Sequence, residues 1–125
     1  MREPARFVAR LATLLRPGGI LIGSVPTTPS VDANPHHLHD FTERAFRRLF
    51  LPHALTEVDC LRQTQYFQPL ALLTRREPRT RNLRRSLPLY YLTHPASLFH
   101  RLAATMRYGF ANKYLTLAWQ RPENS

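Results

Sequence analysis

The chain has 125 residues, of which 43% are hydrophobic, and this size and composition favour one folded domain over a disordered chain. No apolar run approaches the roughly 18 residues that a membrane span requires, and no apolar secretory signal begins the chain, so we expect a cytoplasmic protein without a transmembrane segment. The formal net charge is +10, with seventeen arginines and one lysine, which favours polyanionic partners such as nucleic acid, anionic lipid or phosphorylated substrates. A single cysteine, Cys60, excludes an internal disulfide and has no CxxC partner that would indicate zinc.

The first predicted elements are a helix over residues 4–16 and a strand over residues 20–25. One stripe of the helix carries the apolar residues Phe7, Val8, Leu11, Leu14 and Leu15. The Pro-Gly-Gly sequence at residues 17–19 then ends the helix. The strand is almost continuously apolar, which is typical of a strand covered on both faces of an α/β sheet, so we expect both of its faces to be buried.

A loop over residues 26–40 separates this strand from a second predicted helix, residues 42–51. Thr42 is a suitable N-cap, Glu43 lies in the first turn and Pro52 ends the helix. The alternation that follows predicts a strand over residues 55–63.

Residues 65–111 are predicted as an irregular and helical insert before a last strand, residues 113–120. Within the insert, Pro95 suits the first turn of a helix and Gly109 its C-terminal cap. The last strand alternates with a period of two. The insert also holds the densest arginine run, which we interpret as a solvated loop or as a site for an anionic head group or RNA: Arg75, Arg76, Arg79, Arg81, Arg84 and Arg85.

This order of elements, with three motifs, resembles the C-terminal half of a class I S-adenosylmethionine-dependent methyltransferase. The motifs are Leu-Arg-Pro-Gly-Gly at 15–19, Asn-Pro-His-His-Leu-His-Asp-Phe-Thr at 34–42, and a closing segment at 114–122 that ends in Arg-Pro. The resemblance implies the C-terminal part of an α/β, Rossmann-like sheet, with one parallel-type strand, an antiparallel pair, and helices. It also implies the spatial order 20–25, 113–120, 55–63, in which the first strand has an unpaired apolar edge.

The cofactor site of that family is built by the half that precedes these elements. Glycine occurs here only at positions 18, 19, 23 and 109, so the chain has no Gly-x-Gly-x-Gly turn, and we assign no cofactor-binding residue. The resemblance therefore implies a partial domain over residues 1–125 that is inactive alone. Its complete form would use S-adenosylmethionine to methylate an unknown small-molecule or lipid-linked acceptor.

The loop over residues 26–40 would follow the carboxyl end of a strand, where ligands bind in open α/β sheets. On that basis His37 is the candidate catalytic base, because the pKa of a histidine lies near neutral pH. Asp40 is placed to orient it. The candidate residues for acceptor binding are Thr27, Thr28, His36, His39 and Asp40. A structural role in holding the turn is the alternative, and the crowded histidines do not have zinc-enzyme spacing.

Two other functions remain open. The charge alone supports a basic nucleic-acid-binding module, although no helix-turn-helix, RNA-recognition or zinc-finger signature is present. The second alternative is an interaction subunit that completes its sheet with a partner chain. An exposed strand edge also predicts self-association of the chain. Apolar residues at 87–92 suit an amphiphilic or phosphate-bearing acceptor near a membrane, but ordinary core packing is the interpretation we favour for them.

Overall fold

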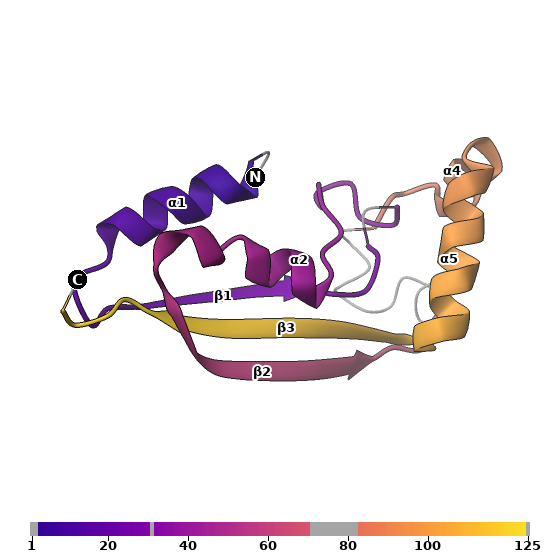
Figure 1. Cartoon of the computed structure of the whole chain (residues 1–125). Helices are drawn as coiled ribbons and strands as arrows, with labels where there is room; N and C mark the ends of the chain where they lie inside the picture. Colours follow the sequence, from indigo (N-terminus) through magenta and orange to yellow (C-terminus); the bar gives the residue numbers. More distant parts are fainter. Residues whose placement is uncertain (1–2, 31, 71–82, 125) are drawn as a thin grey trace. The chain divides into compact units, whose positions relative to one another are not determined.

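Three strands form an antiparallel sheet in the order β1-β3-β2 (Figure 1). The structure is a computed structural model that describes residues 3–30, 32–70 and 83–124. In chain order its elements are α1 (Pro4–Leu14), β1 (Ile20–Pro26), α2 (Glu43–Arg48), the 3-10 turn η1 (Leu51–His53), β2 (Thr56–Tyr66), α4 (Leu87–Thr93), α5 (Pro95–Tyr108) and β3 (Ala111–Gln120). The predicted strand order is confirmed. β1 pairs antiparallel with β3, and the described residues contain no parallel neighbour for β1.

The chain divides into two compact units. The first consists of residues 1–27, 41–63 and 114–125, and the second of residues 28–40 and 64–113. The first unit holds α1, α2, β1 and the larger parts of the other two strands. The second holds the loop after β1, together with α4 and α5.

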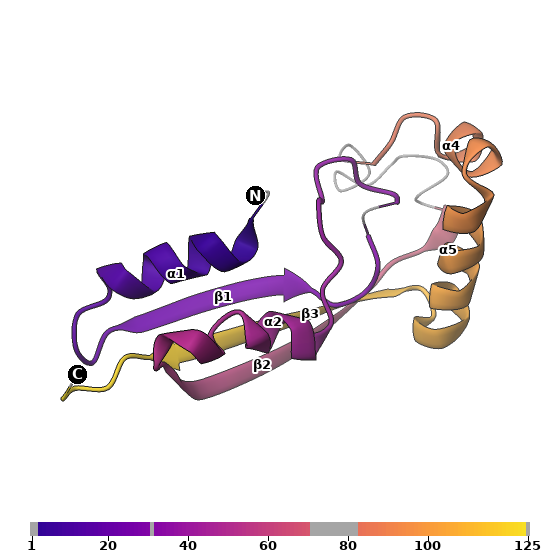
Figure 2. The ribbon, with the colours of Figure 1, turned by 45° about the horizontal axis from the view of Figure 1, so that its top comes forward.

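In the first unit, α1 and α2 cover the same face of the sheet (Figures 1 and 2). The core lies between these layers and consists of Val8, Ala12, Phe46, Phe50, Leu55, Leu115, Leu117 and Trp119. The Phe50 ring stacks on Trp119 with centroids 5.0 Å apart, and Phe46 meets Phe50 edge-on. The predicted period of two in β3 is confirmed, since Leu115, Leu117 and Trp119 are buried.

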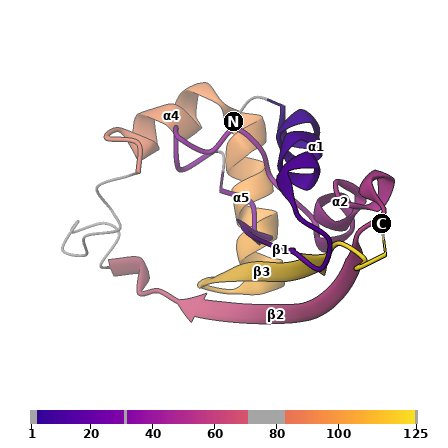
Figure 3. The same ribbon diagram turned by 90° about the vertical axis from the view of Figure 1, so that its left-hand side faces the viewer.

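The other face of β1 is exposed, so the prediction that both faces of residues 20–25 are buried is wrong. Ile22 keeps 67% of its surface exposed and Ile20 54%, whereas Leu21 and Val25 pack against the core. The physical reason is that the described helices of this unit cover one face of the sheet only (Figure 3). The strand composition is therefore more apolar than this sheet requires.

The turn between α1 and β1 is fixed by the end of β3. Gly18 adopts φ +74°, a left-handed conformation that favours glycine. Its backbone N–H donates to the Arg121 carbonyl oxygen at 2.9 Å, and the Arg121 N–H donates to the Gly19 carbonyl at 2.9 Å. The helix itself ends at Leu14, two residues before the predicted boundary, because Leu15 is already extended.

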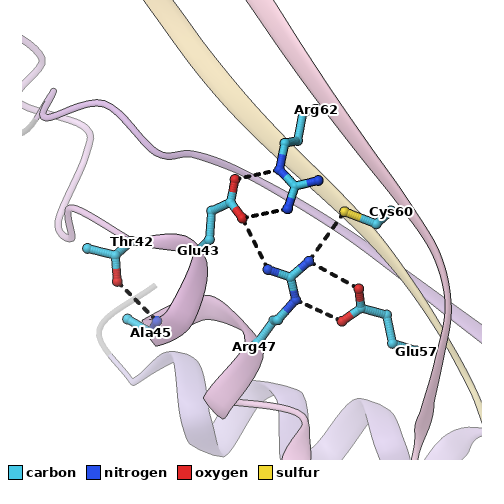
Figure 4. Close-up of polar contacts among 7 residues, drawn as sticks. All are labelled: Thr42, Glu43, Ala45, Arg47, Glu57, Cys60 and Arg62. Atoms are coloured by element: carbon cyan, nitrogen blue, oxygen red, sulfur yellow. Dashed lines mark hydrogen bonds and ion pairs between the residues drawn. The ribbon is translucent and has the colours of Figure 1, made fainter. Parts of the chain in front are cut away.

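The second predicted helix is shorter than expected. Thr42 caps α2 as predicted, with its hydroxyl oxygen accepting the Ala45 N–H at 3.1 Å (Figure 4). The α-helix ends at Arg48, and Pro52 lies inside η1 instead of directly ending α2. Ala54 then turns the chain into β2 with φ +51°.

In the second unit, α5 begins at Pro95 and is closed by Gly109, as predicted. The Gly109 N–H donates to the Thr105 carbonyl at 2.8 Å, and its φ of +67° suits glycine. Core packing is the wrong interpretation for Leu89 and Leu92 of α4, because both are exposed. Within the predicted arginine run, Arg75, Arg76, Arg79 and Arg81 lie outside the described residues.

Candidate functional site

The candidate site is the loop over residues 28–40, whose described part is organised by Ser30. The Ser30 backbone N–H donates to Asp40 Oδ1 at 2.8 Å, and the Ser30 hydroxyl is hydrogen-bonded to His37 Nδ1 at 2.7 Å. The Ser30 carbonyl accepts the Asn34 N–H at 2.9 Å. One serine thus joins the predicted base to the carboxylate that was expected to orient it.

The bond from Ser30 determines what His37 can do chemically. When Nδ1 carries the proton and donates to the Ser30 oxygen, the lone pair of His37 lies on Nε2. That is the tautomer in which the ring accepts a proton from a bound hydroxyl or amine. His37 is half-buried, so the loop holds the ring without enclosing it.

Asp32 fixes this loop to α4 and α5. The Arg101 guanidinium forms a two-pronged ion pair with its carboxylate, in which Nε donates to Oδ2 at 2.8 Å and Nη2 donates to Oδ1. The Tyr91 hydroxyl also donates to Oδ2, at 2.7 Å. Arg101 Nη2 donates in addition to the Pro29 carbonyl at 2.9 Å, and Arg84 Nε to the Asp32 carbonyl at 2.8 Å. Two helices and two arginines therefore hold the loop.

The ionisation of this cluster follows from these contacts. Burial alone raises the pKa of Asp32, but the hydrogen bonds from Arg101 and Tyr91 outweigh it and lower the pKa below its usual value of 3.8. Burial and the adjacent carboxylate raise the pKa of Tyr91 to about 12. Asp32 is therefore an anion and Tyr91 a neutral donor at neutral pH.

The predicted site residues have different surroundings. His36 is exposed, and its backbone N–H donates to Asn34 Oδ1 at 3.0 Å. His39 and Thr27 are half-buried, and Thr27 belongs to the first unit. Thr28 is buried at 5% exposure, and its hydroxyl is one of two buried side-chain polar atoms without a hydrogen-bond partner among the described residues.

Sequence reasoning missed Ser30, Asp32, Tyr91 and Arg101. No local pattern identified Arg101, which lies with Ser97 and Thr105 on the side of α5 away from its apolar repeat. No local pattern identified Asp32 either, because it is 69 residues away from Arg101 in the chain.

The described residues contain no metal-binding cluster, and three of the glycines are occupied by turn or packing contacts. No cluster of three His, Cys, Asp or Glu side chains there has metal-binding geometry. Gly18 and Gly19 lie in the turn bonded to Arg121, and Gly23 packs beneath Phe46 and Phe50, so these glycines do not cradle a phosphate or nucleotide. No helix of the part described has the length and apolar character needed to cross a bilayer.

The polar network on the first unit is structural. Arg47 of α2 pairs with Glu57 of β2 through two hydrogen bonds of 2.9 and 3.1 Å and donates to Cys60 Sγ at 3.3 Å (Figure 4). Glu43 bridges Arg47 and Arg62. These bonds join α2 to an edge strand, and Cys60, half-buried and packed against the core, contributes to that junction.

We compared the chain with protein-family models, with curated proteins and with solved structures, and no match was found in any of the three.

Proposed function

We propose that this chain is the C-terminal part of a class I S-adenosylmethionine-dependent methyltransferase and supplies the acceptor side of the site. The observation that supports this most strongly is the sheet. β1 and β2 run in the same direction with β3 reversed between them (Figure 1), which agrees with the spatial order 20–25, 113–120, 55–63 that the resemblance implies.

The uncovered surfaces of the first unit support the same proposal. β1 is an edge strand of the described sheet and carries two exposed isoleucines. Exposed apolar edge strands are rare in proteins that function alone, because they recruit other chains. In the proposal, strands outside this chain pair with β1 and bind the cofactor.

The proposed role of this chain is to hold and deprotonate the methyl acceptor. Ser30 orients the His37 ring, so that Nε2 accepts the proton from an acceptor hydroxyl or amine. His36, His39 and Asp40, which belong to the same loop, are the proposed contacts with a small-molecule or lipid-linked acceptor. In this proposal the protein works in the cytoplasm.

The decisive test is cofactor binding by calorimetry, first with this chain alone and then with it joined to the coding sequence upstream of Met1. We expect the chain alone not to bind S-adenosylmethionine. A longer chain with a glycine-rich strand-turn-helix should bind it, and so should a complex with a partner chain that supplies those strands. If neither the longer chain nor a co-purifying partner binds the cofactor, the proposal is wrong.

A second test separates the methyltransferase from the nucleic-acid-binding alternative. RNA affinity of the intact chain is measured while salt is raised, because phosphate contacts weaken steeply as salt increases. The basic nucleic-acid-binding module would be favoured if the chain binds RNA strongly and in a salt-dependent way, and if the longer chain does not bind S-adenosylmethionine.

A further inference from the structure

Helix α5 is amphipathic, but its polar side is half-buried and its apolar side is exposed, the opposite of a helix that packs on a core. Its half-buried side includes Ser97, Arg101 and Thr105, and the Arg101 guanidinium on that side bonds to Asp32 and the Pro29 carbonyl. Four apolar residues of α5 are exposed instead. They are Leu98, Phe99, Leu102 and Met106, with exposed fractions of 38%, 72%, 56% and 90%.

Helix α4 extends the exposed apolar surface. Leu89 and Leu92, three residues apart and so on one side of the helix, are exposed by 60% and 79%. Both helices belong to the same compact unit, in which they contact each other. We call these six exposed large apolar residues, Leu89, Leu92, Leu98, Phe99, Leu102 and Met106, the apolar stripe.

The charged residues of the chain segment that carries the apolar stripe are all basic, and the Asp32 carboxylate that contacts this segment is paired with Arg101. The sequence contains no Asp or Glu between Glu77 and Glu123, although 45 residues separate the two. Exposed Arg85, Arg107 and Lys113 lie in that interval. Arg107 and His100 are seven residues apart, so they follow one line along α5 beside the stripe.

We propose that α4 and α5 dock on an anionic lipid surface, with the apolar stripe entering the head-group region and the arginines contacting lipid phosphates. Amphipathic helices with basic residues bind membranes in this way, lying in the plane of the interface. At 14 residues α5 is about 21 Å long, too short to span a bilayer. The excess of basic over acidic side chains on α4, α5 and their flanks favours a lipid surface over a protein partner of mixed charge. This inference is independent of the methyltransferase proposal.

The test is vesicle flotation of the intact chain with phosphatidylcholine vesicles that contain or lack phosphatidylserine. We expect flotation only with the anionic vesicles, reduced at high salt because screening shortens the Debye length to about 3 Å at 1 M. The triple variant Phe99→Ser, Leu102→Ser, Met106→Ser should lower the partition coefficient at least about tenfold, because it removes most of the apolar area that enters the membrane.

A matched triple variant controls for a general loss of apolar surface. Phe7→Ser, Leu14→Ser and Leu51→Ser also change three exposed apolar residues, all on the first unit. This control should float like the unchanged chain, and circular dichroism should show that both variants keep their helices. The proposal fails if the α5 triple floats normally, or if the unchanged chain does not float. If the unchanged chain does not bind vesicles and the α5 triple variant loses dimerisation or RNA binding, the apolar stripe binds a second copy or RNA, and the proposal also fails.

Discussion

Gly23 lets two aromatic rings, Phe46 of α2 and Phe50 at the start of η1, approach the sheet. A Cβ at this position would lie 3.1 Å from Phe46 Cζ and 3.5 Å from Phe50 Cζ. We expect Gly23→Ala to lower the free energy of unfolding by about 1–3 kcal/mol, because an overpacked core must shift. Urea unfolding followed by Trp119 fluorescence measures the change, and Trp119 stacks on one of the two rings.

A second substitution tests whether this close contact is the cause. Phe46→Leu removes the ring atom nearest to the added methyl group, so the double variant should lose less stability than the sum of the two single losses. Ser24→Thr, on the exposed face next to Gly23, keeps a hydroxyl that can accept from Thr116 Oγ1 and should change stability by no more than about 0.5 kcal/mol. Additive losses in the double variant would contradict the steric explanation.

The Asp32 cluster has a defined response to pH. The pKa of Asp32 is lowered on folding, so its contribution to stability is full above its unfolded value of 3.8 and is lost as pH falls through the folded value. We expect an NMR titration of the carboxyl group to give a midpoint below 3.8. Arg101→Gln should raise that midpoint, because it removes the charged partner and leaves burial to oppose ionisation. A midpoint at or above 3.8 in the unchanged chain would show that the ion pair does not form.

Tyr91 provides an independent readout of the same cluster. Its pKa is raised to about 12, so the stability it contributes is complete below pH 10 and is lost as pH rises through about 12. In ultraviolet titration the highest-pH phenolate component should disappear in Tyr91→Phe. Tyr66→Phe, at a position that is 79% exposed, should leave that component in place.

At the scale of elements, the features that depend on local sequence patterns could be predicted, whereas those that depend on tertiary contacts could not. The period of two in β3, the Thr42 cap and the Gly109 cap depend on neighbouring residues, and the structure confirms each of them. Boundaries shifted where tertiary contacts decide them, as at Leu14, after which the chain turns toward Arg121. The side-chain bonds of Ser30 and Asp32 join residues 7 to 69 positions apart, and no periodicity encodes such pairs.

The apolar composition of β1 leads to a prediction at the scale of the strand. In this chain Ile22→Thr should change the free energy of unfolding by no more than about 0.5 kcal/mol, because the side chain is largely exposed. Leu117→Ala, at a fully buried position on the neighbouring strand, should cost about 2–5 kcal/mol. In a longer protein whose added segments cover the outer face, Ile22→Thr should become costly, and urea unfolding of both proteins makes this comparison. A large cost in the short chain would show that the outer face is already covered.

At the scale of the whole molecule, two surfaces can bring copies of the chain together: the free edge of β1 and the apolar stripe of α4 and α5. Edge strands associate through backbone hydrogen bonds, and proteins suppress this with charged residues on the strand. The stripe associates through apolar burial instead. Because the two surfaces belong to different units, substitutions separate them.

We expect the isolated chain to self-associate through β1, with a sedimentation coefficient that rises with protein concentration. Ile22→Lys places a charge on the edge strand and should shift the distribution toward monomer. The Phe99→Ser, Leu102→Ser, Met106→Ser variant should associate like the unchanged chain, because its substitutions lie on α5. The opposite pattern would assign self-association to the apolar stripe. A monodisperse monomer at all concentrations would mean that the edge of β1 is protected, which would remove one support for the proposal that strands outside this chain complete its sheet.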